Sequence, residues 1–90
     1  MRKHFYVYVL QSWKDRKLYI GFTTNLKNRL SQHAKGEVRS TKLRTPFNLI
    51  RYEYFINEAD ARAREKFLKS GYGHRQLAEI LKRTFLNGGS

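Results

Sequence analysis

Hydrophobic and polar positions alternate in two short stretches near the start of the chain, residues 5–10 and 17–22, which is typical of β-strands. A charged break separates the stretches, so together they predict an antiparallel hairpin. One face of each strand carries tyrosines, Tyr6 and Tyr8 in the first strand and Tyr19 in the second. The other face is apolar and predicts the core side of the sheet: Phe5, Val7, Val9, Leu18, Ile20 and Phe22.

A helical period replaces the alternation after residue 24. Residues 25–35 predict a helix that has N-cap residues before it and is stopped by Gly36. Arg29 and His33 are four residues apart, so they lie side by side along the edge of the buried stripe. That stripe consists of Leu26, Leu30 and Ala34.

A second helical period covers residues 58–70, with Asn57 as its N-cap and glycines 71 and 73 as its stop. Its predicted core stripe is Ala59, Ala63 and Phe67. Glu65 falls about 160° around the helix from this stripe, at 100° per residue. The pattern therefore predicts that Glu65 is a solvated residue with Arg62 and Lys69 as ion-pair partners.

The rest of the chain predicts one more strand, one more helix and a loop. Residues 48–55 predict a third strand with Ile50, Tyr52 and Tyr54 on one face. Residues 74–85 predict a last helix that packs through Leu77, Ile80, Leu81 and Phe85. The polar loop 37–46 predicts a mobile surface segment that buries no core. Cations in or near this loop are candidates for phosphate contacts: Lys27, Arg39, Lys42 and Arg44.

These elements predict one α/β domain over residues 1–86, with a disordered tail over 87–90. The expected architecture is a small, mainly antiparallel three-stranded sheet flanked by about three helices. A chain of 90 residues has room for one such sheet and a few helices.

The net charge of the chain indicates what kind of partner it binds. Nineteen Lys and Arg against seven Asp and Glu give a formal net charge of +12, an excess that favours a polyanionic partner, with nucleic acid the commonest. A membrane partner is disfavoured because no long basic amphipathic helix is present. Cysteine is absent, which excludes disulfides and thiolate metal sites. With no secretory signal pattern, a cytoplasmic protein is expected. A monomer is expected as well.

The order of these motifs resembles the GIY-YIG nuclease family, in particular its small standalone members. Val7-Tyr8 looks like the end of the first family motif, and Tyr19-Ile20-Gly21 matches the second in full. Arg29 with His33 fits the helix that follows, and the resemblance continues to Glu65, so it spans about residues 5–70. Each motif alone is short, whereas five elements in the right order and spacing are much more specific.

The resemblance implies a fold, a reaction and a role for each site residue. It implies an endonuclease that cuts a nucleic acid by attack of water, with DNA favoured over RNA as the substrate and RNA left open. Arg29 would neutralise the transition-state phosphate, Tyr8 and Tyr19 would position or deprotonate the water, and His33 would orient the nucleophile or a phosphate oxygen. Glu65 would hold one Mg²⁺ or Mn²⁺.

Two positions depart from the family pattern. The first motif of the family begins with Gly, where this chain has Tyr6, and some relatives carry Lys at the position of Phe22. Both departures favour an alternative, a nucleic-acid-binding module of the same fold with little or no catalysis. A basic accessory protein of an RNA assembly is a third hypothesis. For the nuclease, the small size predicts weak sequence preference or recognition of a junction, nick or flap.

Overall fold

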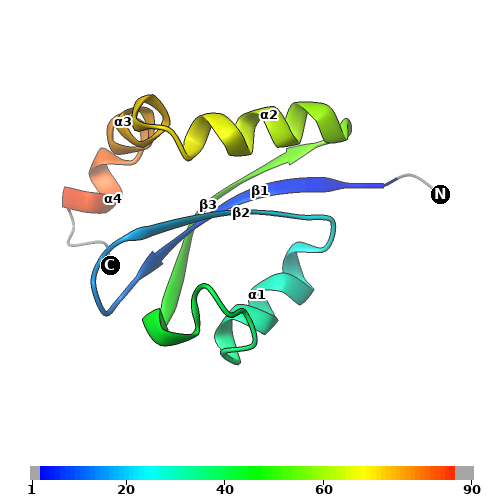
Figure 1. Cartoon of the computed structure of the whole chain (residues 1–90). Helices are drawn as coiled ribbons and strands as arrows, with labels where there is room; N and C mark the ends of the chain where they lie inside the picture. Colours follow the sequence, from blue (N-terminus) through cyan, green and yellow to red (C-terminus); the bar gives the residue numbers. More distant parts are fainter. Residues whose placement is uncertain (1–2, 87–90) are drawn as a thin grey trace.

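A computed structural model describes residues 3–86 and shows an antiparallel sheet between helical layers (Figure 1). Helix α1 covers one face of the sheet, and α2, α3 and α4 lie on the other side (Figure 1). The predicted architecture is confirmed, and the predicted tail lies outside the described residues. The elements are β1 (Phe5–Ser12), β2 (Leu18–Thr23), α1 (Leu26–Ala34), the 3-10 helix η1 (Lys42–Arg44), β3 (Phe47–Phe55), α2 (Glu58–Leu68), α3 (Gly71–Ile80) and α4 (Lys82–Leu86).

Strand β1 is the centre of the sheet, in the order β2-β1-β3, and pairs antiparallel with both neighbours. Helices lie on both sides of the sheet, and every residue of β1 except the half-buried Tyr6 is buried. The predicted core face packs against the C-terminal helices through Val7, Val9, Ile20, Leu68 and Leu77. Burying a side chain of this kind contributes roughly 1.5–3 kcal/mol, so this layer is the main source of stability.

A β-bulge in β3 changes one predicted face. Val9 is paired with Arg51 and Leu10 with Leu49, so Ile50 is an extra residue between the two pairs. Ile50 therefore packs on the core side, while Tyr52 and Tyr54 stay on the opposite face. The prediction that all three share a face is wrong because alternation does not survive a bulge.

Helix α2 is rotated from its predicted orientation. Its buried residues are Ala61 and Leu68, while the predicted stripe of Ala59, Ala63 and Phe67 is exposed. Two contacts at the flanks of the helix accompany this rotation. The Arg62 guanidinium lies 3.6 Å from the centre of the Phe22 ring, and Arg64 Nε donates to Glu53 Oε1 at 2.9 Å.

The C-terminal helices also differ from prediction. The single helix expected over 74–85 is two helices, α3 and α4, and the glycines expected to stop α2 begin α3 instead. Ser70 caps α3 by accepting from Gly73 N at 3.2 Å. A Cβ at Gly73 would collide with the backbone of Phe67 and Leu68, so glycine here lets α3 start directly against the end of α2. Within residues 3–86, no helix has the length and apolar character to cross a membrane.

Candidate active site

The centre of the candidate site is a buried chain of hydrogen bonds beneath α1. Tyr8 Oη lies 2.8 Å from His33 Nε2, and His33 Nδ1 lies 2.8 Å from Thr41 Oγ1. All three side chains are at most 1% exposed. Residues from β1, α1 and the loop before η1 are thus joined, although 25 positions separate Tyr8 from His33.

The hydrogen bond that Thr41 makes with Val38 indicates which atoms of the chain donate and which accept. The Thr41 hydroxyl donates to Val38 O at 3.4 Å, so its oxygen accepts from His33 Nδ1–H. His33 Nε2 is then the acceptor for the Tyr8 hydroxyl. Tyr8 therefore donates a hydrogen bond to a histidine whose other nitrogen is held by threonine.

Tyr19 completes an aromatic cluster around His33. The ring centres of Tyr19 and His33 are 5.2 Å apart, and those of Tyr8 and Tyr19 are 6.2 Å apart. Unlike Tyr8, Tyr19 is half-buried and therefore reaches the surface. The burial of His33 corrects the prediction for α1: the histidine is the residue most deeply inserted, whereas Ala34 is exposed and the leucines at 26 and 30 are half-buried.

Arg29 lies beside the two tyrosines and influences the ionisation of the site. Burial raises the pKa of Tyr8 to about 12, and the Arg29 guanidinium partly opposes this rise. Burial, followed by the charge of Arg29, lowers the pKa of His33 to about 4. At neutral pH Tyr8 is therefore protonated and His33 is neutral, which are the states needed for the phenol to donate to the imidazole.

Gly21 is required by the position of Tyr8. The two residues are cross-strand partners, and a Cβ at Gly21 would collide with the Tyr8 ring and hydroxyl. The glycine of the second motif thus makes room for the tyrosine of the first. This contact supplies a physical reason for the spacing of the two motifs.

We expect Gly21→Ala to destabilise the fold by about 1–3 kcal/mol, the usual range for overpacking a buried site. Gly71→Ala is the matched control, because nothing lies within 4 Å of a Cβ there. Denaturant unfolding measures both variants. Equal stability of Gly21→Ala and wild type would contradict the contact between Gly21 and Tyr8.

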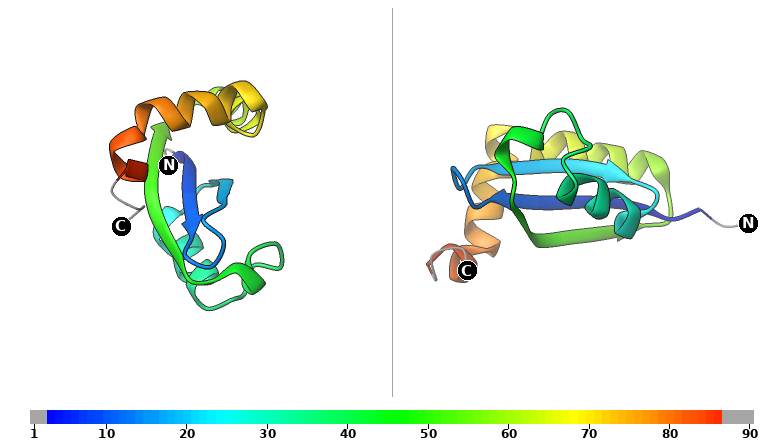
Figure 2. Two further views of the ribbon diagram at one scale, coloured as in Figure 1. Left: turned by 90° about the vertical axis from the view of Figure 1, so that its left-hand side faces the viewer. Right: turned by 90° about the horizontal axis from the view of Figure 1, so that it is seen from below.

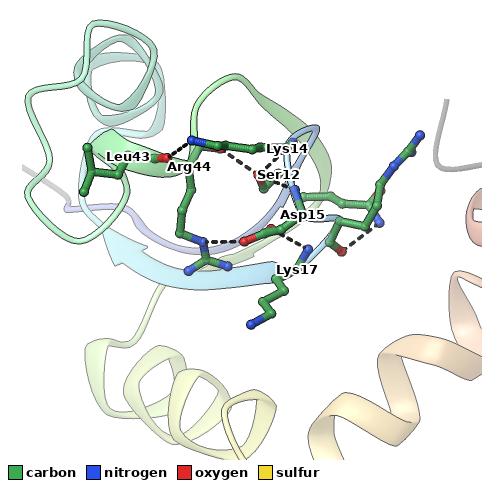
Figure 3. A network of polar contacts seen from close by, with 8 residues as sticks. Ser12, Lys14, Asp15, Lys17, Leu43 and Arg44 are labelled. Atoms are coloured by element: carbon green, nitrogen blue, oxygen red, sulfur yellow. Dashed lines mark hydrogen bonds and ion pairs between the residues drawn. The ribbon is translucent and has the colours of Figure 1, made fainter.

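The loop 37–46 is anchored to the hairpin, contrary to prediction. Val38 and Thr41 are buried, although the polar composition of the loop predicted no core contribution. The Ser12 hydroxyl donates to Arg44 O at 2.7 Å, and Lys14 Nζ donates to Leu43 O at 3.3 Å (Figure 3). These bonds hold η1 against the hairpin turn and so keep Thr41 against His33.

The predicted phosphate-binding cations fall into two groups. Lys27, Arg39 and Lys42 are exposed and available to a polyanion. Arg44 is instead engaged within the protein, with its Nε 3.4 Å from Asp15 Oδ2 (Figure 3). Arg44 therefore contributes to anchoring the loop, which weakens its case as a phosphate contact.

Glu65 lies on the other side of the sheet from the tyrosine cluster. It is four residues after Ala61 and three before Leu68, so it is on the buried stripe of α2. Its side chain is only 16% exposed, so the prediction of a solvated position was wrong. The two predicted partners are present: Glu65 Oε2 lies 2.9 Å from Lys69 Nζ, and Oε1 lies 3.5 Å from Arg62 Nη1.

The edge strand β2 has contacts with both sets of side chains, those around Glu65 and those of the tyrosine cluster. Arg62, the partner of Glu65, stacks on Phe22, and Phe22 is adjacent to Gly21, on which Tyr8 rests. β2 ends the sheet, and it carries Tyr19, which packs on His33, and on its other face Phe22, which lies under Arg62. A phosphodiester that crosses the edge could therefore meet both sets.

The donor set around Glu65 fits a metal bound largely by substrate and water. Within residues 3–86, no three His, Cys, Asp or Glu side chains gather into a metal-binding group. Mg²⁺ is commonly held by one or two carboxylates, with waters and substrate phosphates as the other ligands. Glu65 can supply that carboxylate, with the ammonium of Lys69 moving aside.

Thr41 is the site residue that sequence reasoning missed. It lies in a loop with no periodic pattern, and its contact with His33 depends on the way the loop folds back. The histidines at 4 and 74 are exposed and lie outside this chain of hydrogen bonds.

Comparisons with known proteins find one matching family model, relatives with similar sequences and a solved structure with a similar fold. The family model described as the GIY-YIG catalytic domain matches residues 4–77. A UPF0213 protein of Staphylococcus haemolyticus is 37% identical over 84 residues, covering 92% of this chain and 100% of that protein. One of Clostridium perfringens is 40% identical over 65 residues, covering 71% of this chain and 69% of that protein. The solution NMR structure of the UPF0213 protein BH0048 from Bacillus halodurans aligns with a TM-score of 0.56 at 32% identity, over 86% of this chain and 84% of that one.

Proposed function

This chain belongs to the GIY-YIG family, and we propose on that basis that it is a metal-dependent endonuclease. Its substrate is DNA, cut by attack of water with weak sequence preference or with preference for a particular DNA structure. The observation that carries the proposal is the buried Tyr8–His33–Thr41 chain beside Arg29. This chain places a tyrosine, a neutral histidine and an arginine within reach of one another, which are the groups that activation of a water beside a phosphate requires.

Tyr8 and His33 act together on the attacking water. Tyr8 is fully buried in the free protein, so substrate binding has to admit a water to its oxygen. That water gives the oxygen a proton as the phenol passes its own proton to His33 Nε2, and the hydroxide attacks the phosphorus as the bond to the leaving oxygen breaks. Thr41 is a positioning residue, because its oxygen fixes the Nδ1–H form of the imidazole. In the free protein the pKa of His33 is about 4. An approaching phosphodiester brings negative charge to Arg29 and raises the basicity of the imidazole.

Arg29 and Tyr19 receive the phosphate. The Arg29 guanidinium is planar and presents donors in a fork that matches two phosphate oxygens. One of its nitrogens, Nη1, is already oriented by donating to Gln32 Oε1 at 3.0 Å. The half-buried Tyr19 offers its hydroxyl at the surface next to the same position.

Glu65 would hold one Mg²⁺ or Mn²⁺ at the β2 edge. Such an ion supplies countercharge for the phosphate and the leaving oxygen. In the protein itself, Glu65 is oriented by its ion pairs with Arg62 and Lys69.

A nucleic-acid-binding module of the same fold is the second candidate. Phe22 favours it, because this ring stacks under Arg62 at a position where some relatives place a lysine. The ion pairs of Glu65 favour it as well, since both carboxylate oxygens already have a cationic partner. In that case the net charge of +12 would still bind a polyanion.

A substrate panel distinguishes the two candidates. Labelled single-stranded, duplex, nicked and branched DNA and RNA are incubated with wild-type protein in Mg²⁺ or Mn²⁺, and in chelator. We expect cleavage of at least one DNA substrate with metal and none with chelator. Salt-sensitive binding without cleavage of any substrate would reject the nuclease in favour of the binding module.

A further inference from the structure

Three tyrosines form a row on the face of the sheet that α1 only partly covers. Tyr6 on β1 lies between Tyr52 and Tyr54 of β3, with ring centres 6.2 Å and 5.5 Å away. Tyr52 is 54% exposed and Tyr54 is 46% exposed. Seen from below, α1 and the loop after it lie over β1 and β2, and β3 runs at the uncovered side (Figure 2). We call Tyr6, Tyr52 and Tyr54 the tyrosine row.

A hollow of about 450 Å³ lies between this row and the first turns of α1. This volume is within the range of ligand-binding clefts. Tyr6 and Tyr52 form its aromatic wall, Asn25 and Thr24 supply polar groups, and Lys27 supplies a positive charge. Among the described residues that line it, none is acidic. An aromatic wall with a cation at its rim suits a ligand that combines a flat ring with a phosphate.

The row is continuous with the candidate active site. Tyr8 has Gly21 as its cross-strand partner on one side and Tyr52 on the other. Neighbouring strands are about 4.8 Å apart, so Tyr52 lies one strand away from the reactive phenol on the same face. A DNA strand whose phosphate is at Arg29 would pass its next nucleotides over the row.

A hydrogen bond to His4 holds the ring of Tyr54 in one orientation. His4 Nδ1 lies 2.6 Å from Tyr54 Oη, and the two rings are 5.4 Å apart. A ring held in place loses less conformational freedom when a base stacks on it.

We propose that the tyrosine row is a stacking subsite for an unpaired base of the DNA strand that is cut. The proposal deepens the nuclease function stated above and rests on it. Bases within a duplex have both planes covered by their neighbours, so an open tyrosine row selects a strand with unpaired bases. Lys27 then contacts the phosphate of the stacked nucleotide.

Binding to two single strands of equal length tests this subsite. One is oligothymidine, and the other is an abasic strand with the same phosphates and no bases. Binding is measured by fluorescence polarisation in chelator, so that no cleavage is needed. We expect wild-type protein to bind oligothymidine about fivefold or more tightly than the abasic strand. Equal affinity for the two strands would overturn the proposal.

Three variants make the test specific. Tyr52→Leu removes the ring and should bring the ratio of the two affinities close to one, while Tyr52→Phe keeps the ring and should retain the preference. Tyr72→Leu is the matched control, because Tyr72 is 72% exposed on α3 and outside the row. An equal loss of base preference in Tyr72→Leu would overturn the proposal. So would a dimer that Tyr52→Leu dissociates without any base preference in wild type.

The subsite and the nuclease can fail separately. Base preference in chelator without cleavage in the metal panel would reject the nuclease and retain the subsite. Metal-dependent cleavage without base preference would reject the subsite and retain the nuclease.

Discussion

Arg29→Ala is expected to lower the rate of cleavage by about 10² to 10³, the usual loss when one preorganised transition-state donor is removed. Arg29 is beside Tyr8 and Tyr19, where in the proposed reaction it would face the phosphate as charge develops on it. The side chain is only partly buried and packs no core, so the fold should be retained. Single-turnover kinetics with saturating protein separate the chemical step from binding.

Two variants control for charge. Arg29→Lys keeps the positive charge and loses the fork, so it should recover binding more than rate. Lys27→Ala removes an exposed cation from the same helix and should weaken binding without changing the rate of bound substrate. If Arg29→Ala reduced affinity and rate by equal factors, Arg29 would be a simple phosphate clamp.

The sheet could be predicted from the sequence because alternation reports directly on which side of a strand each residue lies. Phe5, Val7 and Val9 occupy the predicted face of the central strand. Alternation failed only at Ile50, where the bulge adds a residue that nothing in the local sequence distinguishes. Helix α1 was predicted within a residue of its ends, since Asn25 caps it by accepting from Asn28 N.

The rotation of α2 could not be predicted in the same way. Its sequence contains alanines at 59, 61 and 63, and such small side chains fit either a buried or an exposed position. The orientation is accompanied by long-range contacts that periodicity does not encode, such as the Arg64–Glu53 pair. The half-buried position of Glu65 could be recognised only from that orientation.

Some residues of the site could be predicted from motif spacing, and others depend on long-range folding of the chain. Tyr8, Tyr19, Arg29 and His33 could be proposed together because their motifs keep a fixed order and spacing, and the structure brings these four close together. Thr41 could not be predicted, because its contact with His33 depends on how the loop 37–46 is anchored, and this loop has no periodic pattern of hydrophobic residues. The need for glycine at position 21 follows from the structure, because the Tyr8 ring occupies the space that a Cβ there would fill.

Glu65→Gln is expected to abolish metal-dependent cleavage while leaving DNA affinity in chelator equal or slightly higher. The change keeps the shape of the side chain and removes the charge that would hold the ion. A negative charge contributes nothing favourable to binding a polyanion without metal, so its loss should not weaken that binding. Cleavage and metal-free binding are measured on the same DNA substrate.

Glu58→Gln is the matched control for this variant. Glu58 is on the same helix and also pairs with Arg62, with its Oε2 3.6 Å from Nε, but its side chain is 57% exposed. Both variants lose helix ion pairs that are each worth about 0.2–0.5 kcal/mol, so neither should unfold the protein. If Glu65 served only as a partner of Arg62 and Lys69, the two variants would cleave alike. Wild-type cleavage by Glu65→Gln would place the metal elsewhere, whereas loss of cleavage in Glu65→Gln alone would assign the ion to the carboxylate beside the β2 edge.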